Sequence, residues 1–229
     1  MFSKGVTDVF FDVDHTLWDF EKNSALTFKK ILKYCDVEVS LNDFLKVYKP
    51  INFECWKRYR EEKITQKELR YQRFSRTFKG LNIQVSDQLI DQLSKAYIEH
   101  LSSNTHVFKH TFEILDYLKP KYKLHIITKG PQAVQDKKLK KSKLYSYFDQ
   151  VINSEMAGVK KPNRHIFNLA LKLANTQAKY SVMVGDNTEA DILGAKAVGF
   201  KTIHFNSNEE PKHDVCPIIN ELIEIKNFL

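Results

Sequence analysis

The second half of the chain alternates strand-like and helix-like segments, and this pattern restricts the possible fold more than any other feature. The strand-like runs are 123–128, 148–153, 180–186 and 201–205, and the helical patterns are 111–119, 131–144, 162–174 and 188–199. Strands that alternate with helices predict a parallel sheet covered by helices on both faces. The apolar run at 8–12 supplies one more strand at the N-terminal side. We therefore predict an α/β, Rossmann-like core.

The segment between the first and second predicted strands has a different pattern of apolar residues. From about residue 19 to 105 the apolar residues recur at helical spacing, and strand patterns are almost absent. Residues 1–16 and 106–229 are therefore predicted to form the core, with 17–105 inserted as a helical domain. The helix boundaries expected there are an N-cap at Ser40 with a helix through Tyr48, a new helix at Pro50, a capping box of Thr65 and Glu68 with a stop at Gly80, and a helix after Ser86.

Composition narrows the functional class only slightly. The chain has 229 residues, a net charge of +8 and a pI near 9.2, so its partner is expected to be an anion of some kind. The lysine-rich stretch at 136–144 is interpreted as a solvated helix. No apolar run is long enough to span a membrane, and no secretory signal is evident, so we expect a cytoplasmic protein. The three cysteines are far apart, which favours free thiols in a reducing compartment.

The residues that could take part in catalysis or ligand binding follow the ends of the predicted strands. Asp12 and Asp14 follow the first strand, Thr128 and Lys129 the second, and Asp186 the run at 180–186. The strand at 148–153 leads to the pair Lys160–Lys161 before Pro162, and Asp191 follows Asp186. Ligands of parallel sheets lie beyond the carboxyl ends of the strands, so these groups are expected to converge. Carboxylates suit Mg²⁺, and hydroxyl and ammonium groups suit a phosphoryl group. The set predicts Mg²⁺-assisted phosphoryl chemistry.

Four of these stretches, "DVDHT", "TKG", "KKP" and "GDNTEAD", together resemble the four motifs of the haloacid dehalogenase-like (HAD) hydrolases. The resemblance spans residues 8–205 and implies that the helical insertion is a C1 cap. It implies that Asp12 is the nucleophile that forms an aspartyl-phosphate, and that Asp14 is the general acid and base. Thr128 and Lys161 would hold the phosphoryl group. Asp12, Asp186 and the backbone carbonyl of Asp14 would hold Mg²⁺, or Mn²⁺ in its place.

Three positions leave alternatives open. Asp191 is implied to support either the metal or the lysine, although an acid in the first turn of a helix is favourable for structural reasons alone. Lys129 stands where the most similar subfamily commonly has asparagine, and it could either add charge beside the substrate or point into solvent. Asp186 could also serve as a helix N-cap. By its spacing to Pro162, Lys161 rather than Lys160 matches the family lysine.

The expected activity is hydrolysis of small phosphomonoesters. The dehalogenase branch of the family does not need the second acid, so Asp14 favours a phosphatase. Within the family, the stretches "FDVDHTLWDFEKNS", "VQDKKLKKSKL" and "GVKKPNRHIF" most resemble the capped, YjjG-like pyrimidine nucleoside 5′-monophosphatases. A nucleotide is therefore the expected partner. The alternatives are a sugar-phosphate or phosphoglycolate phosphatase, then a phosphomutase, and lastly a non-catalytic basic protein that binds nucleic acid or a membrane surface. For the oligomeric state, the expectation is either a monomer or a dimer.

Overall fold

The structure is a computed structural model that describes residue 2 and residues 5–229. The chain folds into two compact units, one made of Met1–Phe20 with Thr105–Leu229 and the other of Glu21–Asn104. Among the described residues, no helix combines the length and the apolar character needed to cross a membrane. Cys35, Cys55 and Cys216 are all free thiols.

The first unit is built on a six-stranded parallel sheet, as the alternating pattern predicted. The strands are β1 (Asp8–Phe11), β2 (Lys123–Thr128), β3 (Gln150–Asn153), β4 (Ser181–Gly185), β5 (Lys201–Phe205) and β6 (Ile218–Ile219). Their order in the sheet is β3-β2-β1-β4-β5-β6, and every neighbouring pair is parallel. The chain therefore switches direction of winding beside β1, so the ends of β1, β2 and β4 lie together.

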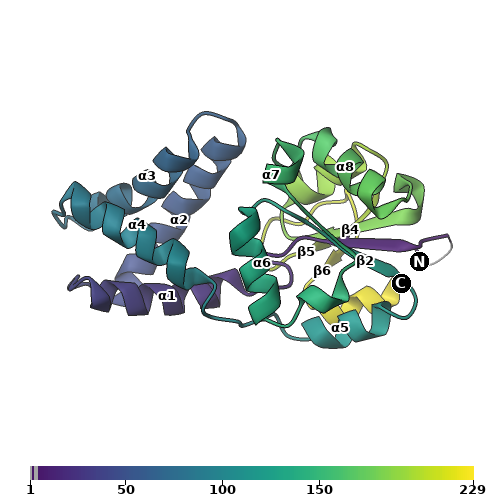
Figure 1. Cartoon of the computed structure of the whole chain (residues 1–229), viewed down its shortest axis with the longest axis horizontal. Coiled ribbons are helices and arrows are strands. Elements are labelled where there is room, and N and C mark those ends of the chain that lie inside the picture. The colour runs from purple at the N-terminus through teal and green to yellow at the C-terminus, as the bar shows by residue number, and fades with distance from the viewer. Residues whose placement is uncertain (1, 3–4) are drawn as a thin grey trace. The chain divides into compact units, whose positions relative to one another are not determined.

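Helices cover both faces of this sheet (Figure 1). They are α5 (Thr111–Leu118), α6 (Gln132–Lys141), α7 (Ser154–Ala157), α8 (Arg164–Ala174) and α9 (Gly194–Lys196). Short 3-10 helices lie at Tyr145–Tyr147, Ala178–Tyr180 and Leu222–Asn227, and a π-helix lies at Thr188–Leu193. Phe10 of β1, Phe167 of α8 and Phe200 belong to one buried cluster, which also contains apolar residues of β2, β3 and β4.

The helix predicted over 188–199 is present from Thr188 to Lys196, but Thr188–Leu193 forms a π-helix and only the short α9 that follows it is α-helical. Both Asp191 and Ile192 donate their backbone N–H to the carbonyl of Asn187, so the turn is widened. The C-terminal β6 and the 3-10 helix after it were not predicted, since their apolar residues are too few to set a period.

The second unit is helical, with α1 (Phe20–Tyr34), α2 (Leu41–Arg60), α3 (Gln66–Gly80) and α4 (Asp87–Leu101). The predicted N-caps at Ser40 and Ser86, the capping box at Thr65 and the end at Gly80 are confirmed. The prediction of two helices meeting at Pro50 is wrong, because α2 runs through it. Burial of Phe44, Tyr48 and Cys55 along one side of α2 outweighs the single hydrogen bond that proline removes.

The two segments that join the units run side by side within the first unit. Trp18 forms an antiparallel bridge with Val107. The backbone N–H of Asp19 donates to the carbonyl of His106 at 3.1 Å, and that of Phe108 donates to Leu17 at 3.0 Å. The chain thus leaves and re-enters the core at one place, directly after the loop that carries Asp14.

Candidate active site

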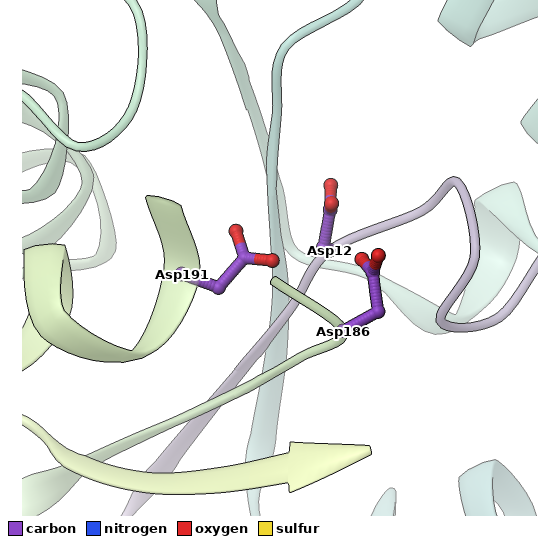
Figure 2. A group of neighbouring side chains, drawn as sticks. All are labelled: Asp12, Asp186 and Asp191. Atoms are coloured by element: carbon purple, nitrogen blue, oxygen red, sulfur yellow. The ribbon is translucent and has the colours of Figure 1, made fainter. Parts of the chain in front are cut away.

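Three buried carboxylates meet at the carboxyl ends of β1 and β4. Asp12 follows β1, Asp186 follows β4, and Asp191 lies in the π-helix. One oxygen from each of the three lies within 4.8 Å of the others. Figure 2 shows the three side chains on separate backbone segments, with Asp12 and Asp186 pointing the same way and Asp191 extending toward them. The sequence prediction that these strand ends converge is therefore reproduced in the geometry.

Local backbone structure brings Asp191 close to β4. Asn187 caps the π-helix with its side chain, which accepts the backbone N–H of Ala190 at 2.8 Å, so the cap role considered for Asp186 falls to its neighbour. Asp191 Oδ2 in turn accepts the N–H of Asn187 at 3.1 Å. A Cβ atom on Gly185 would lie 2.5 Å from the Cβ of Asp191, so only glycine allows this approach.

Lys161 supplies the buried positive charge of the cluster. Its Nζ lies 3.0 Å from Asp12 Oδ1 and 2.6 Å from Asp191 Oδ1, and it donates to the carbonyl of Ile127 at 2.7 Å. Burial alone would lower the pKa of Lys161, but the two carboxylates raise it above its ordinary value. The position next to Pro162 is thus the one that reaches the carboxylates, as the spacing argument favoured.

The negative charge of the cluster exceeds what this lysine neutralises. Burial raises the pKa of Asp12 to about 6, with Lys161 opposing the shift and Asp191 adding to it. Burial, together with repulsion from Asp191 and Asp12, raises the pKa of Asp186 well above its ordinary value. Burial would also raise the pKa of Asp191, but Lys161 and Lys129 hold it below the ordinary value. Three acids beside one buried ammonium group fit a site for a hard divalent cation.

Asp186 is oriented by neutral donors rather than by a cation. Asn208 donates from Nδ2 to Asp186 Oδ2 at 2.7 Å, and the hydroxyl of Thr16 donates to Oδ1 at 3.4 Å. The buried His204 donates from Nε2 to the backbone carbonyl of Asp186 at 2.9 Å. These contacts fix the carboxylate without neutralising it, which leaves its charge available to a metal ion.

Asp14 has different contacts from the three carboxylates of the cluster. Its Oδ1 is 2.6 Å from the Nζ of Lys138, and its Oδ2 accepts a hydrogen bond from Gln135 at 3.1 Å. The strand ends at Phe11, so Asp12 and Asp14 both belong to the loop beyond it rather than to one face of the strand. The two acids of the motif therefore have separate partners, and this separation lets them take different chemical roles.

The end of β2 carries the two remaining predicted residues. Thr128 is buried, and its hydroxyl oxygen accepts a hydrogen bond from Gln135 at 2.5 Å. Lys129 is half-buried, and its positive charge lowers the pKa values of Asp12, Asp186 and Asp191 against the effect of burial. Of the two alternatives for Lys129, charge beside the site is the one that this arrangement favours.

Gln135 and Lys138 were missed by the sequence interpretation, which treated the stretch 136–144 as a solvated helix. That prediction is wrong for Lys138, whose side chain is 3% exposed. A signal was present, because Gln135, Lys138, Leu139 and Ser142 recur at the spacing of one helix face and all four are buried. Lys138 lies on the same helix face as the buried Leu139, and a count of the charges in the stretch does not reveal this.

The sequence profile of the family described as "Haloacid dehalogenase-like hydrolase" matches residues 9–205. This chain belongs to that family. The match contains both strand-end acids at β1 and the whole π-helix, so the haloacid dehalogenase-like assignment and the α/β fold with its helical insertion are confirmed. The protein is thus an enzyme of a hydrolase family.

Relatives of known name extend over nearly the whole chain. The pyrimidine 5′-nucleotidase YjjG of Escherichia coli is 31% identical over 225 residues, which cover 96% of this chain and 96% of that protein. A glyceraldehyde 3-phosphate phosphatase of Methanothermobacter thermautotrophicus is 31% identical over 232 residues, with 96% and 98% covered. The crystal structure of the magnesium-bound HAD-hydrolase YfnB of Bacillus subtilis has a TM-score of 0.88 and 27% identity, with 98% of each chain covered.

Proposed function

We propose that this hydrolase is a Mg²⁺-dependent phosphatase that cleaves small phosphomonoesters through an aspartyl-phosphate on Asp12, with nucleoside 5′-monophosphates as the preferred substrates. The observation that carries the proposal is the pair of acids with separate partners: Asp12 beside Lys161, and Asp14 beside Lys138. A hydrolase that attacks carbon needs only the first acid, whereas phosphoester cleavage also needs a proton donor for the leaving oxygen.

The reaction would proceed in two displacements at phosphorus. A carboxylate oxygen of Asp12 attacks the phosphorus atom, the bond from phosphorus to the ester oxygen breaks, and Asp14 gives its proton to that oxygen. Asp14 then takes a proton from water, whose oxygen attacks the phosphorus and breaks its bond to Asp12. Inorganic phosphate leaves, and both acids return to their starting forms.

The buried cations make the first approach possible. Two negative groups repel, so Asp12 reaches a phosphate only where positive charge surrounds both. Lys161 lies 3.0 Å from Asp12, and the half-buried Lys129 acts on the same carboxylates. Thr128 would donate its hydroxyl to a phosphoryl oxygen. Mg²⁺, when bound by Asp12, Asp186 and the backbone carbonyl of Asp14, would neutralise further charge on the phosphoryl group.

The substrate class rests on the relatives. YjjG is named a pyrimidine 5′-nucleotidase and matches 96% of the chain, which supports a nucleoside monophosphate. A named glyceraldehyde 3-phosphate phosphatase matches at the same 31% identity, and it supports a small sugar phosphate as the second candidate. The helical unit is inserted between β1 and β2, where this family carries a cap, and we expect it to select between the two.

A panel of phosphomonoesters tests the proposal. Phosphate release is measured from nucleoside 5′-monophosphates, glyceraldehyde 3-phosphate and phosphoglycolate, with Mg²⁺, with Mn²⁺ and with EDTA. The wild type, Asp12→Asn and the control Asp149→Asn, which replaces an exposed acid of the same unit, are compared. We expect turnover of nucleotides that EDTA and Asp12→Asn abolish and that Asp149→Asn leaves intact. Turnover of none of these esters under any metal condition would refute the phosphatase proposal.

A further inference from the structure

One face of α6 directs two polar side chains at the candidate active site. Gln135 is 1% exposed and Lys138 is 3% exposed, although both are long polar residues in a helix rich in exposed lysines. A buried lysine gives up its hydration, which costs free energy unless its partners compensate. The contacts of these two residues therefore indicate what their burial achieves.

Lys138 is held between one carboxylate and two aromatic rings. Its Nζ is 2.6 Å from Asp14 Oδ1, 4.4 Å from the ring centre of Trp18 and 5.6 Å from that of Phe20. Ring faces attract the ammonium group, and their bulk limits the directions in which the side chain can turn. Asp14 itself is about one quarter exposed, so water could solvate its charge without a lysine. The contact thus orients the carboxylate more than it neutralises a buried charge.

Gln135 connects Asp14 to Thr128. Its Nε2 donates to Asp14 Oδ2 at 3.1 Å and to the hydroxyl oxygen of Thr128 at 2.5 Å. The opposite amide orientation would place two acceptors, Oε1 and the carboxylate, against each other with no proton between them. Because the Thr128 oxygen accepts from Gln135, its own hydrogen stays available for a donor role toward a phosphoryl oxygen.

The backbone beside β2 leaves room for this glutamine. A Cβ atom on Gly130 would lie 2.6 Å from Cδ of Gln135 and 3.0 Å from its Nε2. Any side chain at this position would push the amide away from both of its partners. The absence of a side chain at Gly130 therefore leaves the space that the amide of Gln135 occupies.

We propose that Gln135 and Lys138 are positioning residues of the reaction. They hold both oxygens of Asp14 so that its proton is delivered to the leaving oxygen, and Gln135 also directs the Thr128 hydroxyl toward the phosphoryl group. This inference rests on the proposed phosphatase function. It predicts that loss of Lys138 harms the cleavage of esters whose leaving group needs a proton, and spares those whose leaving group does not.

Single-turnover kinetics with enzyme in excess test this prediction. Release of the leaving group then reports only the first displacement. Two substrates are compared: the alkyl phosphomonoester that the wild type cleaves best in the panel, and p-nitrophenyl phosphate, whose leaving group departs as a stable anion. The variants are Lys138→Met and the control Lys137→Met, which removes an exposed lysine from the same helix. Thermal unfolding shows that each variant is folded, and Lys138→Gln replaces Lys138→Met if the latter is not.

We expect Lys138→Met to slow alcohol release by roughly 10- to 100-fold and nitrophenol release by less than about threefold. Lys137→Met should leave both rates unchanged. Gln135→Leu should in addition raise the enzyme concentration needed for half-maximal rate with both esters, because Thr128 loses its orienting donor. An equal slowing of both substrates by Lys138→Met, or no slowing of either, would overturn the inference while the phosphatase proposal stands. A wild type that cleaves no phosphomonoester would overturn both.

Discussion

Replacing Asp12 with asparagine should make the metal-free protein more stable while it abolishes turnover. Asp12 is 2% exposed and lies with Asp186 and Asp191 in a cluster that, among the residues the structure describes, has the ammonium group of Lys161 as its buried positive partner. The carboxylate of Asp12 is therefore in an environment that opposes its charge. Asparagine keeps the shape of the side chain and removes that charge.

The size of the effect follows from the pKa of Asp12, which burial raises from 3.8 to about 6. Because the folded state binds this proton more tightly, the contribution of Asp12 to stability is fully present below pH 3.8 and is lost as the pH rises through about 6. A gap of about two pH units corresponds to about 3 kcal/mol at 1.36 kcal/mol per unit. Asparagine has no carboxyl group to ionise, so the Asp12→Asn variant does not lose this free energy. Above pH 7 the unfolding temperature of the variant should therefore be higher than that of the wild type by about 6 to 12 °C.

Thermal unfolding in EDTA at pH 5 and pH 8 measures the difference. Asp12→Asn should exceed the wild type at pH 8, and the gap should narrow at pH 5, where the wild-type carboxyl is mostly protonated. The control Asp149→Asn should follow the wild type at both pH values, since Asp149 is exposed. Added Mg²⁺ should raise the unfolding temperature of the wild type and of the control more than that of Asp12→Asn.

An Asp12→Asn protein that is less stable than the wild type at pH 8 without metal would refute this reasoning. Such a result would mean that the ion pair with Lys161, at 3.0 Å, outweighs the burial of the carboxylate. The excess negative charge assigned to the cluster would then be absent, and so would the electrostatic argument for a cation there.

Three further substitutions probe the rest of the site. Lys161→Met should lower the free energy of unfolding by about 3–5 kcal/mol, measured in urea, because it leaves buried carboxylates unpaired; unchanged stability would contradict the ion pairs described. Asp14→Asn should lower kcat by roughly 10²- to 10⁴-fold with the unfolding temperature retained, and near-normal kcat would exclude it as the proton donor. Gly185→Ala should cost about 1–3 kcal/mol in thermal unfolding, because its Cβ would lie 2.5 Å from that of Asp191, and a neutral result would show that Asp191 moves freely.

The strand ends could be predicted from sequence because two independent signals coincide there. Short apolar runs define the strands, and a parallel sheet must bring their carboxyl ends to one edge. Asp12, Thr128 and Asp186 therefore lie where the pattern places them, although nothing in the pattern gives their distances. The π-helix could not be predicted, because the two hydrogen bonds to Asn187 that widen the turn have no compositional signature.

Pro50 and Lys138 show a second limit of sequence interpretation. Each was judged by the local rule for its residue type, proline as the start of a helix and lysine as a solvated charge. In α2 the local cost of Pro50 is outweighed by burial along the helix, and in α6 the charge of Lys138 has a carboxylate and two rings as partners. Both outcomes depend on residues distant in sequence, which a local rule does not contain.

The adjoining segments at Trp18 and Val107 have a consequence for how such enzymes diversify. Because the chain leaves and re-enters the core at one bridged pair, the insertion between them can grow, shrink or be exchanged in evolution without redrawing the sheet. Trp18 also lies 4.4 Å from the Nζ of Lys138, which contacts Asp14. The point where an insertion joins the core is therefore constrained, because Trp18 both pairs with Val107 and contacts the lysine that binds Asp14.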